Sequence, residues 1–288
     1  MFFCYNNFMI NWFPGHMNKT LKQMQADSKI CDCFIYILDA RCPMSCINPE
    51  FVKVIGNKPI IFVLNKSDLV EKTAIDKFKQ YFASLGHVCI SLNATISGSG
   101  KIIINTIKSV FKDRIEKNRE RNVNFIIRAM ILGIPNSGKS TIVNNLCGKA
   151  RAITGNKAGV TRSKQWVKLD NFIEIMDTPG VLLPNFENEE FAYNLAIVGS
   201  VKDEVLYLPD VAISLIKRFK KLNILSNLNT KYGVNCDEST QEIEILKQIG
   251  KKRGCLVKGG EIDIERSAKV LITDFRSGKL GKICLESI

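Results

Sequence analysis

The stretch that decides the fold is Gly133-Ile134-Pro135-Asn136-Ser137-Gly138-Lys139-Ser140. An apolar run, residues 125–132, precedes it, and a pattern typical of a helix, residues 139–146, follows it. A strand, a glycine-containing loop and a helix in that order form the phosphate-binding loop of P-loop proteins. The backbone N–H groups of such a loop and the N-terminus of its helix attract phosphate, so the sequence predicts a nucleoside triphosphate site.

Within this loop, Lys139 is expected to bridge the β- and γ-phosphates as a catalytic residue, and the Ser140 hydroxyl to bind Mg²⁺. Ser137, Gly138 and Thr141 are the other expected contacts with the phosphates.

Two downstream segments fit the same site by their order and spacing, Gly159-Val160-Thr161-Arg162 and Asp177-Thr178-Pro179-Gly180. Thr161 is expected to close on the Mg²⁺ and the γ-phosphate during catalysis. We expect Asp177 to hold the ion through water and the Gly180 N–H to bond the γ-phosphate.

A second motif, Asn65-Lys66-Ser67-Asp68, ends the apolar run 59–64 and predicts which base is bound. The Asp68 carboxylate can accept hydrogen bonds from N1–H and the exocyclic amine of guanine. Adenine has neither donor, so it would leave a buried carboxylate partly unpaired. Asn65 is expected to support the base edge and Lys66 to lie over its face, and the predicted ligand is GTP.

The next apolar run, 87–92, leads into Asn93 and Ala94, whose backbone is expected to meet guanine O6. These base-reading segments lie before the phosphate loop, whereas the usual order in GTPases is the phosphate loop first. The sequence therefore predicts a circularly permuted GTP-binding domain.

Short apolar runs alternate with helical patterns through the first part of the chain, which predicts an open, doubly wound α/β sheet. The expected strands are 33–38, 59–64, 87–92 and 125–132, with a hairpin of 165–169 and 172–176, and the expected helices are 71–85, 100–121 and 139–146.

After residue 184 the strand pattern ends. Four helical patterns follow, at 189–201, 209–222, 239–252 and 262–275. We therefore expect a GTP-binding domain over 1–184 and a small all-helical domain over 185–288.

The chain has 288 residues and a formal net charge of +13. Lys and Arg number 25 against 13 Asp and Glu in residues 1–184, but 16 against 15 in residues 185–288. Nearly all of the excess lies in the nucleotide domain, where an anionic partner, most simply nucleic acid, is expected. The dense charges of 112–121 are explained by a solvated helix face.

Other features of the sequence exclude some classes of protein. The ten cysteines and two histidines include no Cys-x-x-Cys pair, so reduced thiols are expected and no zinc site. No apolar run reaches the roughly 18 residues that a membrane span needs. Residues 1–10 lack the features of a secretory or mitochondrial signal. A cytoplasmic protein without membrane contact is expected.

These motifs in this order, together with Trp12-Phe13-Pro14-Gly15-His16-Met17 and Phe275-Arg276-Ser277-Gly278-Lys279-Leu280-Gly281, resemble the circularly permuted GTPases of ribosome assembly. The resemblance is closest to the members that mature the bacterial large subunit, and it covers nearly the whole chain from Trp12. It implies a GTPase that binds GTP and GDP and whose partner is the large-subunit precursor with its rRNA.

The resemblance also implies how water is oriented. Val181 follows Gly180, where many GTPases have a glutamine, and a valine side chain has no donor or acceptor for water. The family implies that His16 takes this catalytic role. In the alternative interpretation, Trp12 and Phe13 anchor the segment and His16 only caps a turn.

Asn136 matches the phosphate-loop asparagine that helps to hold K⁺ in potassium-activated relatives, so the implied ions are Mg²⁺ and K⁺. The alternative is that Asn136 only shapes the loop. One departure from the family pattern is the pair Cys42 and Cys46, which we interpret as neutral drift.

The family implies that the helical domain contacts rRNA, although its net charge near zero is also compatible with solvated faces. Its candidate phosphate contacts are Lys251, Lys252, Arg253, Lys258, Arg276 and Lys279. Two other functions stay open: a permuted GTPase that acts on the small subunit, and an RNA-binding scaffold that uses GTP only as a conformational lock.

Overall fold

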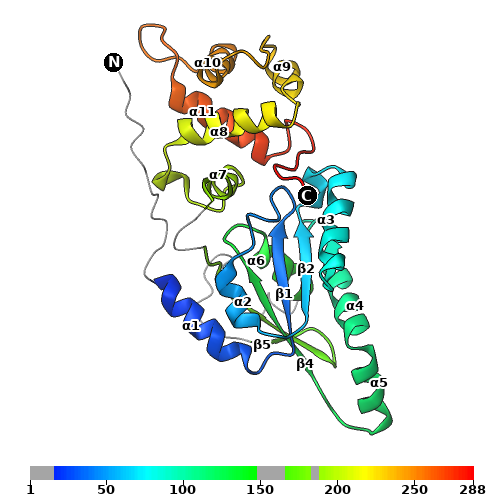
Figure 1. Ribbon diagram of the computed structural model, residues 1–288. Coiled ribbons are helices and arrows are strands. Elements are labelled where there is room, and N and C mark those ends of the chain that lie inside the picture. The colour runs from blue at the N-terminus through cyan, green and yellow to red at the C-terminus, as the bar shows by residue number, and fades with distance from the viewer. Residues whose placement is uncertain (1–15, 148–165, 183–187) are drawn as a thin grey trace.

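The computed structural model describes residues 16–147, 166–182 and 188–288 (Figure 1). Its centre is a six-stranded sheet of strand order β3-β2-β1-β4-β6-β5, parallel except for β5, which pairs antiparallel with β6. The strands are β1 (Cys33–Asp39), β2 (Ile60–Asn65), β3 (Val88–Ser91), β4 (Ile127–Gly133), β5 (Trp166–Lys168) and β6 (Ile173–Asp177). The predicted sheet and its hairpin are confirmed.

Strand β1 shows why these runs form a sheet that is covered on both sides. All seven of its residues are buried. Phe34, Tyr36 and Leu38 belong to one hydrophobic core, and Cys33, Ile35 and Ile37 belong to the other. Burial on both faces is typical of parallel sheets covered by helices.

Helices cover the two faces in the doubly wound arrangement. The first core includes residues of α1 (His16–Ser28), α2 (Pro49–Ile55) and α3 (Lys72–Ser84), and the second includes residues of α4 (Gly100–Val110) and α6 (Lys139–Cys147). Neither α1 nor α2 was expected from the sequence, because α1 is mostly polar and α2 is only two turns long.

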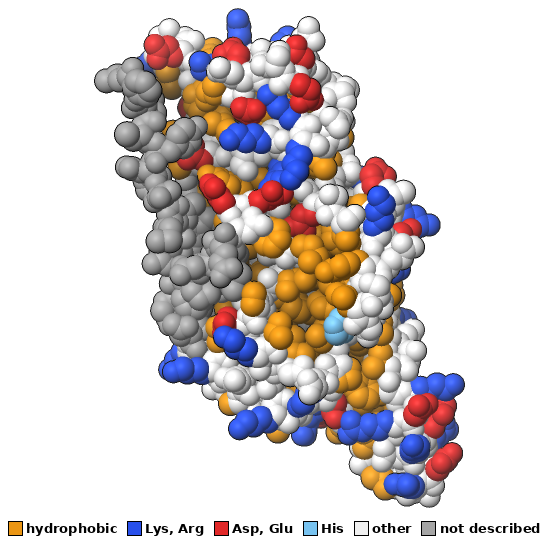
Figure 2. All heavy atoms as spheres, viewed as in Figure 1, with side chains coloured by type: hydrophobic (Ala, Val, Ile, Leu, Met, Phe, Trp, Pro, Cys, Tyr) orange, Lys and Arg blue, Asp and Glu red, His pale blue; other side chains and the backbone are white. Residues whose placement is uncertain are grey.

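The expected helix over 100–121 is wrong as a single element. It is divided at Phe111 into α4 and α5 (Lys112–Glu120). The second helix has no fully buried residue, and only Ile115 of this helix packs against the core, so little core contact holds it in line with the first. Its mixed charges are visible at the lower end of the molecule in Figure 2, as expected for a solvated helix face.

The C-terminal part is helical, with one isolated bridge between Leu256 and Ile262. Its helices are α7 (Glu189–Ile197), α8 (Leu208–Lys221), α9 (Ser226–Tyr232), α10 (Glu242–Lys252) and α11 (Ile264–Arg276). The short α9 was not expected. The boundary at 184/185 lies outside the described residues and stays a prediction. None of the helices in the described part is long and apolar enough to cross a membrane.

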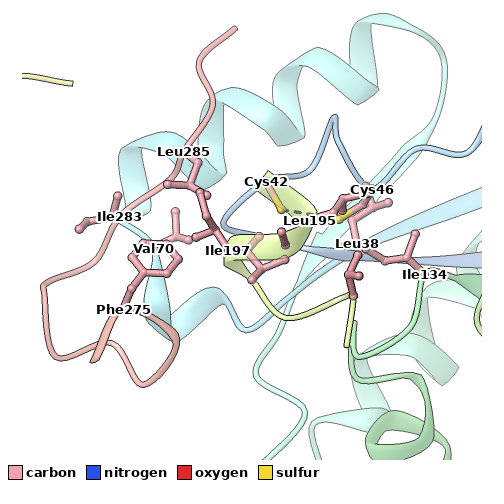
Figure 3. Packing of buried hydrophobic residues seen from close by; sticks show 14 of the residues in the cluster. Leu38, Cys42, Cys46, Val70, Ile134, Leu195, Ile197, Phe275, Ile283 and Leu285 are labelled. Atoms are coloured by element: carbon pink, nitrogen blue, oxygen red, sulfur yellow. Dashed lines mark hydrogen bonds between the residues drawn. The ribbon is translucent and has the colours of Figure 1, made fainter. Parts of the chain in front are cut away.

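The helical part lies over the end of the sheet at which β1 and β2 finish (Figure 1). Figure 3 shows Leu38, Val70 and Ile134 in one cluster with Leu195 and Ile197 of α7 and Phe275 of α11. Because this core is continuous, the helical part rests directly on the edge of the sheet that carries the nucleotide motifs.

The chain then returns to the sheet after α11. The Ile283 N–H donates to the Leu69 carbonyl at 2.9 Å, and the Leu285 N–H donates to the Arg41 carbonyl at 2.7 Å. The Glu286 carboxylate accepts from the N–H groups of Met44 at 2.7 Å and Ser45 at 2.9 Å. The segment after α11 therefore packs against the loop that follows β1 and holds it by hydrogen bonds.

Candidate GTP site

The phosphate loop connects β4 to α6, so the predicted strand, loop and helix are confirmed. Lys139 is the first residue of α6, and its Nζ donates to the Ile134 carbonyl at 2.6 Å. Burial lowers the pKa of Lys139 to about 8, and the nearby Asp177 carboxylate opposes this shift. Lys139 is buried, so its ammonium has little contact with water, and this strengthens its attraction for phosphate oxygens.

Asn65 joins the guanine motif to the phosphate loop. Its Nδ2 donates to the Ser137 carbonyl at 2.8 Å, and its Oδ1 accepts from the Ala94 N–H at 3.0 Å. Gly138 has a φ of +94°, and a Cβ there would lie 2.1 Å from Asn65 Nδ2. The loop therefore approaches Asn65 as closely as it does only because residue 138 has no side chain. The structure brings both motifs together although their order is reversed.

Lys66 is held between two groups. Its backbone is left-handed, with a φ of 58°, and its Nζ contacts the Asn136 carbonyl at 3.0 Å and an Asp39 oxygen at 2.8 Å. Such a position suits a lysine whose stem covers a base.

Asp68 lies exposed in the short helix η1 (Ser67–Leu69). The Ser67 N–H donates to the Leu92 carbonyl at 3.2 Å, which places the loop before Asn93 beside η1. Asp68 and the backbone of Asn93 and Ala94 therefore come from neighbouring loops, as guanine recognition requires.

The segment after β6 lies against the phosphate loop. The Thr178 hydroxyl donates to the Ile131 carbonyl at 2.5 Å. A Cβ on Gly180 would lie 2.7 Å from the Pro135 nitrogen and 2.8 Å from Lys139 Nζ. Gly180 is thus close to the group predicted to bind the β- and γ-phosphates.

Oxygen donors for Mg²⁺ are present at this end of the sheet. Ser140 is half-buried in the first turn of α6, and Asp177 is half-buried at the end of β6. A hydroxyl and a carboxylate are ligands that Mg²⁺ prefers, directly or through water, so the residues present fit this ion. Thr141 is exposed in the same turn.

Four residues of the predicted catalytic and switch segments are placed differently from the rest of the site, or lie outside the described part of the chain. Thr161 lies outside the described residues, as does the side chain of His16, which begins α1. Asn136 is exposed, and its Nδ2 donates to the Gly199 carbonyl in the helical part at 2.6 Å. Val181 is fully buried, so it takes no part in binding water at the surface.

Two residues that matter were missed by the sequence analysis. Asp39 and Arg41 are 1% and 2% exposed and form a two-pronged ion pair at 2.9 and 2.7 Å. Burial alone would raise the pKa of Asp39, but Arg41 and then Lys66 outweigh it and hold that pKa well below its ordinary value. Opposite charges two residues apart at the end of an apolar strand were the available signal.

We expect Arg41→Met to lower the free energy of unfolding by about 3 kcal/mol, because it leaves the buried Asp39 carboxylate with Lys66 as its remaining charged partner. Lys53→Met is the matched control, since its partner Glu50 and Lys53 itself are both accessible to solvent, and it should cost less than about 1 kcal/mol. Urea denaturation measures both. Equal losses in the two variants would contradict a structural role for the buried pair.

The fold and these motifs define a circularly permuted P-loop GTPase. A family model described as "50S ribosome-binding GTPase" matches residues 128–246. The chain is 39% identical to ribosome biogenesis GTPase A of Bacillus cereus over 97% of this chain and 94% of that protein. It is 32% identical to mitochondrial ribosome-associated GTPase 1 of Bos taurus over 96% and 88% of the two chains.

Among solved structures, GDP-bound YlqF matches with a TM-score of 0.63 and 25% identity, covering 92% of this chain and 98% of that one. GNP-bound YlqF from T. maritima matches with a TM-score of 0.62 and 25% identity, covering 93% and 97%. The chain belongs to the ribosome biogenesis GTPase A family.

Proposed function

We propose that this GTPase is a switch in the assembly of the large ribosomal subunit, and that contact with the precursor particle stimulates GTP hydrolysis. The relatives named above support a ribosomal partner by the names they carry. The observation that carries the switch itself is the hydrogen bond from Asn136 to Gly199, which joins the phosphate loop to the helical part. A site in direct contact with a second structural unit can report its occupancy to that unit.

In the proposed reaction, water attacks the γ-phosphorus of GTP and GDP leaves. Lys139 stabilises negative charge on the phosphates. Ser140, Asp177 and Thr161 would hold Mg²⁺, which neutralises part of the developing charge when it is bound. The Gly180 N–H would bond the γ-phosphate, and His16 would orient the attacking water, since Val181 has no polar atom to do so.

The test is GTP turnover by the full chain with purified large subunits, with small subunits, and with neither. We expect low turnover alone and stimulation by large subunits. Stimulation by small subunits alone would favour the small-subunit alternative, and no stimulation by either would favour the scaffold that uses GTP as a lock.

The same assay tests His16. We expect His16→Ala to keep its affinity for GTP and lose the stimulated turnover. His87→Ala, at the only other histidine of the chain, is the control and should keep it. Unchanged stimulated turnover in His16→Ala would favour the alternative, in which His16 only caps a turn.

We also propose that K⁺ binds beside the phosphates with the help of Asn136. The bond from Nδ2 to Gly199 fixes the orientation of the amide, so its Oδ1 is the atom left to bind a cation. We expect turnover to be at least about tenfold higher in potassium than in sodium buffer, since charge neutralisation at this point is worth up to several orders of magnitude in GTPases. Asn136→Ala should abolish the difference. Equal rates for the native protein in both salts would remove K⁺ from the mechanism.

We infer that the helical part contacts rRNA through a basic pocket between α10 and α11. The cavity measures about 400 Å³ and is lined by Arg253, Arg266, Lys269, Lys279 and the buried Asp274, together with Val270 and Thr273. Arg253 and Lys279 pair with Asp274 at 3.1 and 3.2 Å. Four cations around one carboxylate leave a net positive surface that suits RNA phosphates.

Arg276 was one of the predicted phosphate contacts, and its surroundings do not support that role. It forms a two-pronged ion pair with Asp203 and donates to two carbonyls of α7, and its side chain is only 24% exposed. Its donors are used within the protein, so it is not available to RNA. The sequence analysis also missed Arg266 and Lys269, which lie one turn apart on α11.

The double substitution Arg266→Gln with Lys269→Gln tests this surface. We expect weaker binding to large-subunit rRNA and a salt dependence of log K that is shallower by about 1.4 to 1.8, since each of the two lost phosphate contacts removes about 0.7 to 0.9 from the slope. Lys72→Gln with Lys77→Gln on α3 removes the same charge elsewhere and should leave the slope unchanged. An identical slope in both double variants would contradict the proposed surface.

A further inference from the structure

The C-terminal end of α7 is the point at which the helical part contacts the phosphate loop. A helix leaves its last carbonyls without partners inside the helix. Here side chains from three other segments donate to successive carbonyls: Arg276 to Ala196 at 2.8 Å and Ile197 at 2.9 Å, Arg41 to Val198 at 3.4 Å, and Asn136 to Gly199 at 2.6 Å.

Arg276 sets the geometry of this helix end. Its guanidinium binds both oxygens of Asp203, at 2.8 and 2.9 Å, and also reaches the α7 carbonyls. Gly199 follows with a φ of +84°, and a Cβ at that position would lie 3.2 Å from the Cζ and Nε of Arg276. Arg276 therefore lies directly against the turn that aims the Gly199 carbonyl at Asn136.

Asn136 needs such support. Its φ of 57° is in the left-handed region, which asparagine adopts more readily than most residues but less readily than glycine. Two contacts hold it there: Lys66 donates to its carbonyl at 3.0 Å, and its own side chain donates to Gly199. The first contact comes from the guanine motif and the second from the helical part.

We propose that Arg276 is a positioning residue for the phosphate loop. By fixing Gly199 it holds Asn136, and Asn136 holds the loop in the conformation that binds the phosphates of GTP. The inference rests on the proposed assignment of this loop to GTP and is independent of the ribosomal partner. Since coupling between two sites is reciprocal, bound nucleotide also stabilises the end of α7.

The alternative is that Arg276 only stabilises the helical part. A double-mutant cycle separates the two roles, because a purely structural residue does not need Asn136 for its effect. The dissociation constant of a non-hydrolysable GTP analogue with Mg²⁺ is measured for the native chain, Arg276→Gln, Asn136→Ala and the double variant.

We expect Arg276→Gln to raise the dissociation constant at least about fivefold in the native background, the lower end of typical coupling between sites. In the Asn136→Ala background the same substitution should change it by less than about twofold, because the path to the loop is already broken. Arg276→Lys should lie between, since a lysine keeps the charge but cannot bind the carbonyls and Asp203 together. Equal ratios in both backgrounds would overturn the proposal.

Arg114→Gln is the matched control. Arg114 also forms an ion pair, with Asp32 at 2.6 Å, and lies over the Phe125 ring, but it is remote from α7. It should leave nucleotide affinity unchanged. If Arg276→Gln does not fold, Asp203→Asn loosens the same guanidinium and the cycle is measured with it. Additive effects there would also overturn the proposal.

The outcome is separable from that of the proposed function. Failure of the native chain to bind the GTP analogue would contradict the assignment of the site itself. Normal binding without stimulation by ribosomal particles would contradict only the ribosomal role, and the cycle would still decide whether Arg276 acts through Asn136.

Discussion

The buried ion pair between Asp39 and Arg41 connects the guanine motif to the helical part. Asp39 also binds Lys66 of the guanine motif, while Arg41 lies 5.6 Å from the Phe275 ring of α11 and donates weakly to carbonyls of both α7 and α11. Two opposite charges can be buried at this depth only because each satisfies the other. The helical part therefore meets the sheet at a fixed position rather than across a purely apolar surface, which would allow sliding.

Circular permutation changes the order of the motifs along the chain and leaves their contacts intact. The bond from Asn65 to Ser137 spans 72 residues, and the bond from Lys66 to Asn136 spans 70. The phosphate loop after β4 and the base-reading loops after β2 and β3 still meet at the carboxyl ends of parallel strands, with β1 between β2 and β4. Open α/β sheets bind their ligands at this edge. Binding depends on this meeting point, so the position of the chain ends is free to vary.

The sequence was sufficient for features that are local. The six strands, the phosphate loop and the permuted order follow from apolar periodicity and short motifs. Features that depend on tertiary contacts could not be predicted from the sequence. Arg276 resembled a surface cation because Asp203 lies 73 residues away. Of the four cations that line the basic pocket, the sequence analysis named Arg253 and Lys279 but not Arg266 and Lys269, because the net charge of that region is near zero and the four come from separate parts of the chain.

The return of the chain to the sheet after α11 determines the order in which the protein can be completed. Ser45 and Glu286 are separated by 241 residues, and a polypeptide is synthesised from its N-terminus. The loop after β1, which lies beside Asp39 and Arg41, therefore acquires its last partners only after the whole helical part has been translated. During synthesis the nucleotide motifs are therefore translated before the helical part and the C-terminal segment that support them. The site can be fully assembled only when translation is nearly complete.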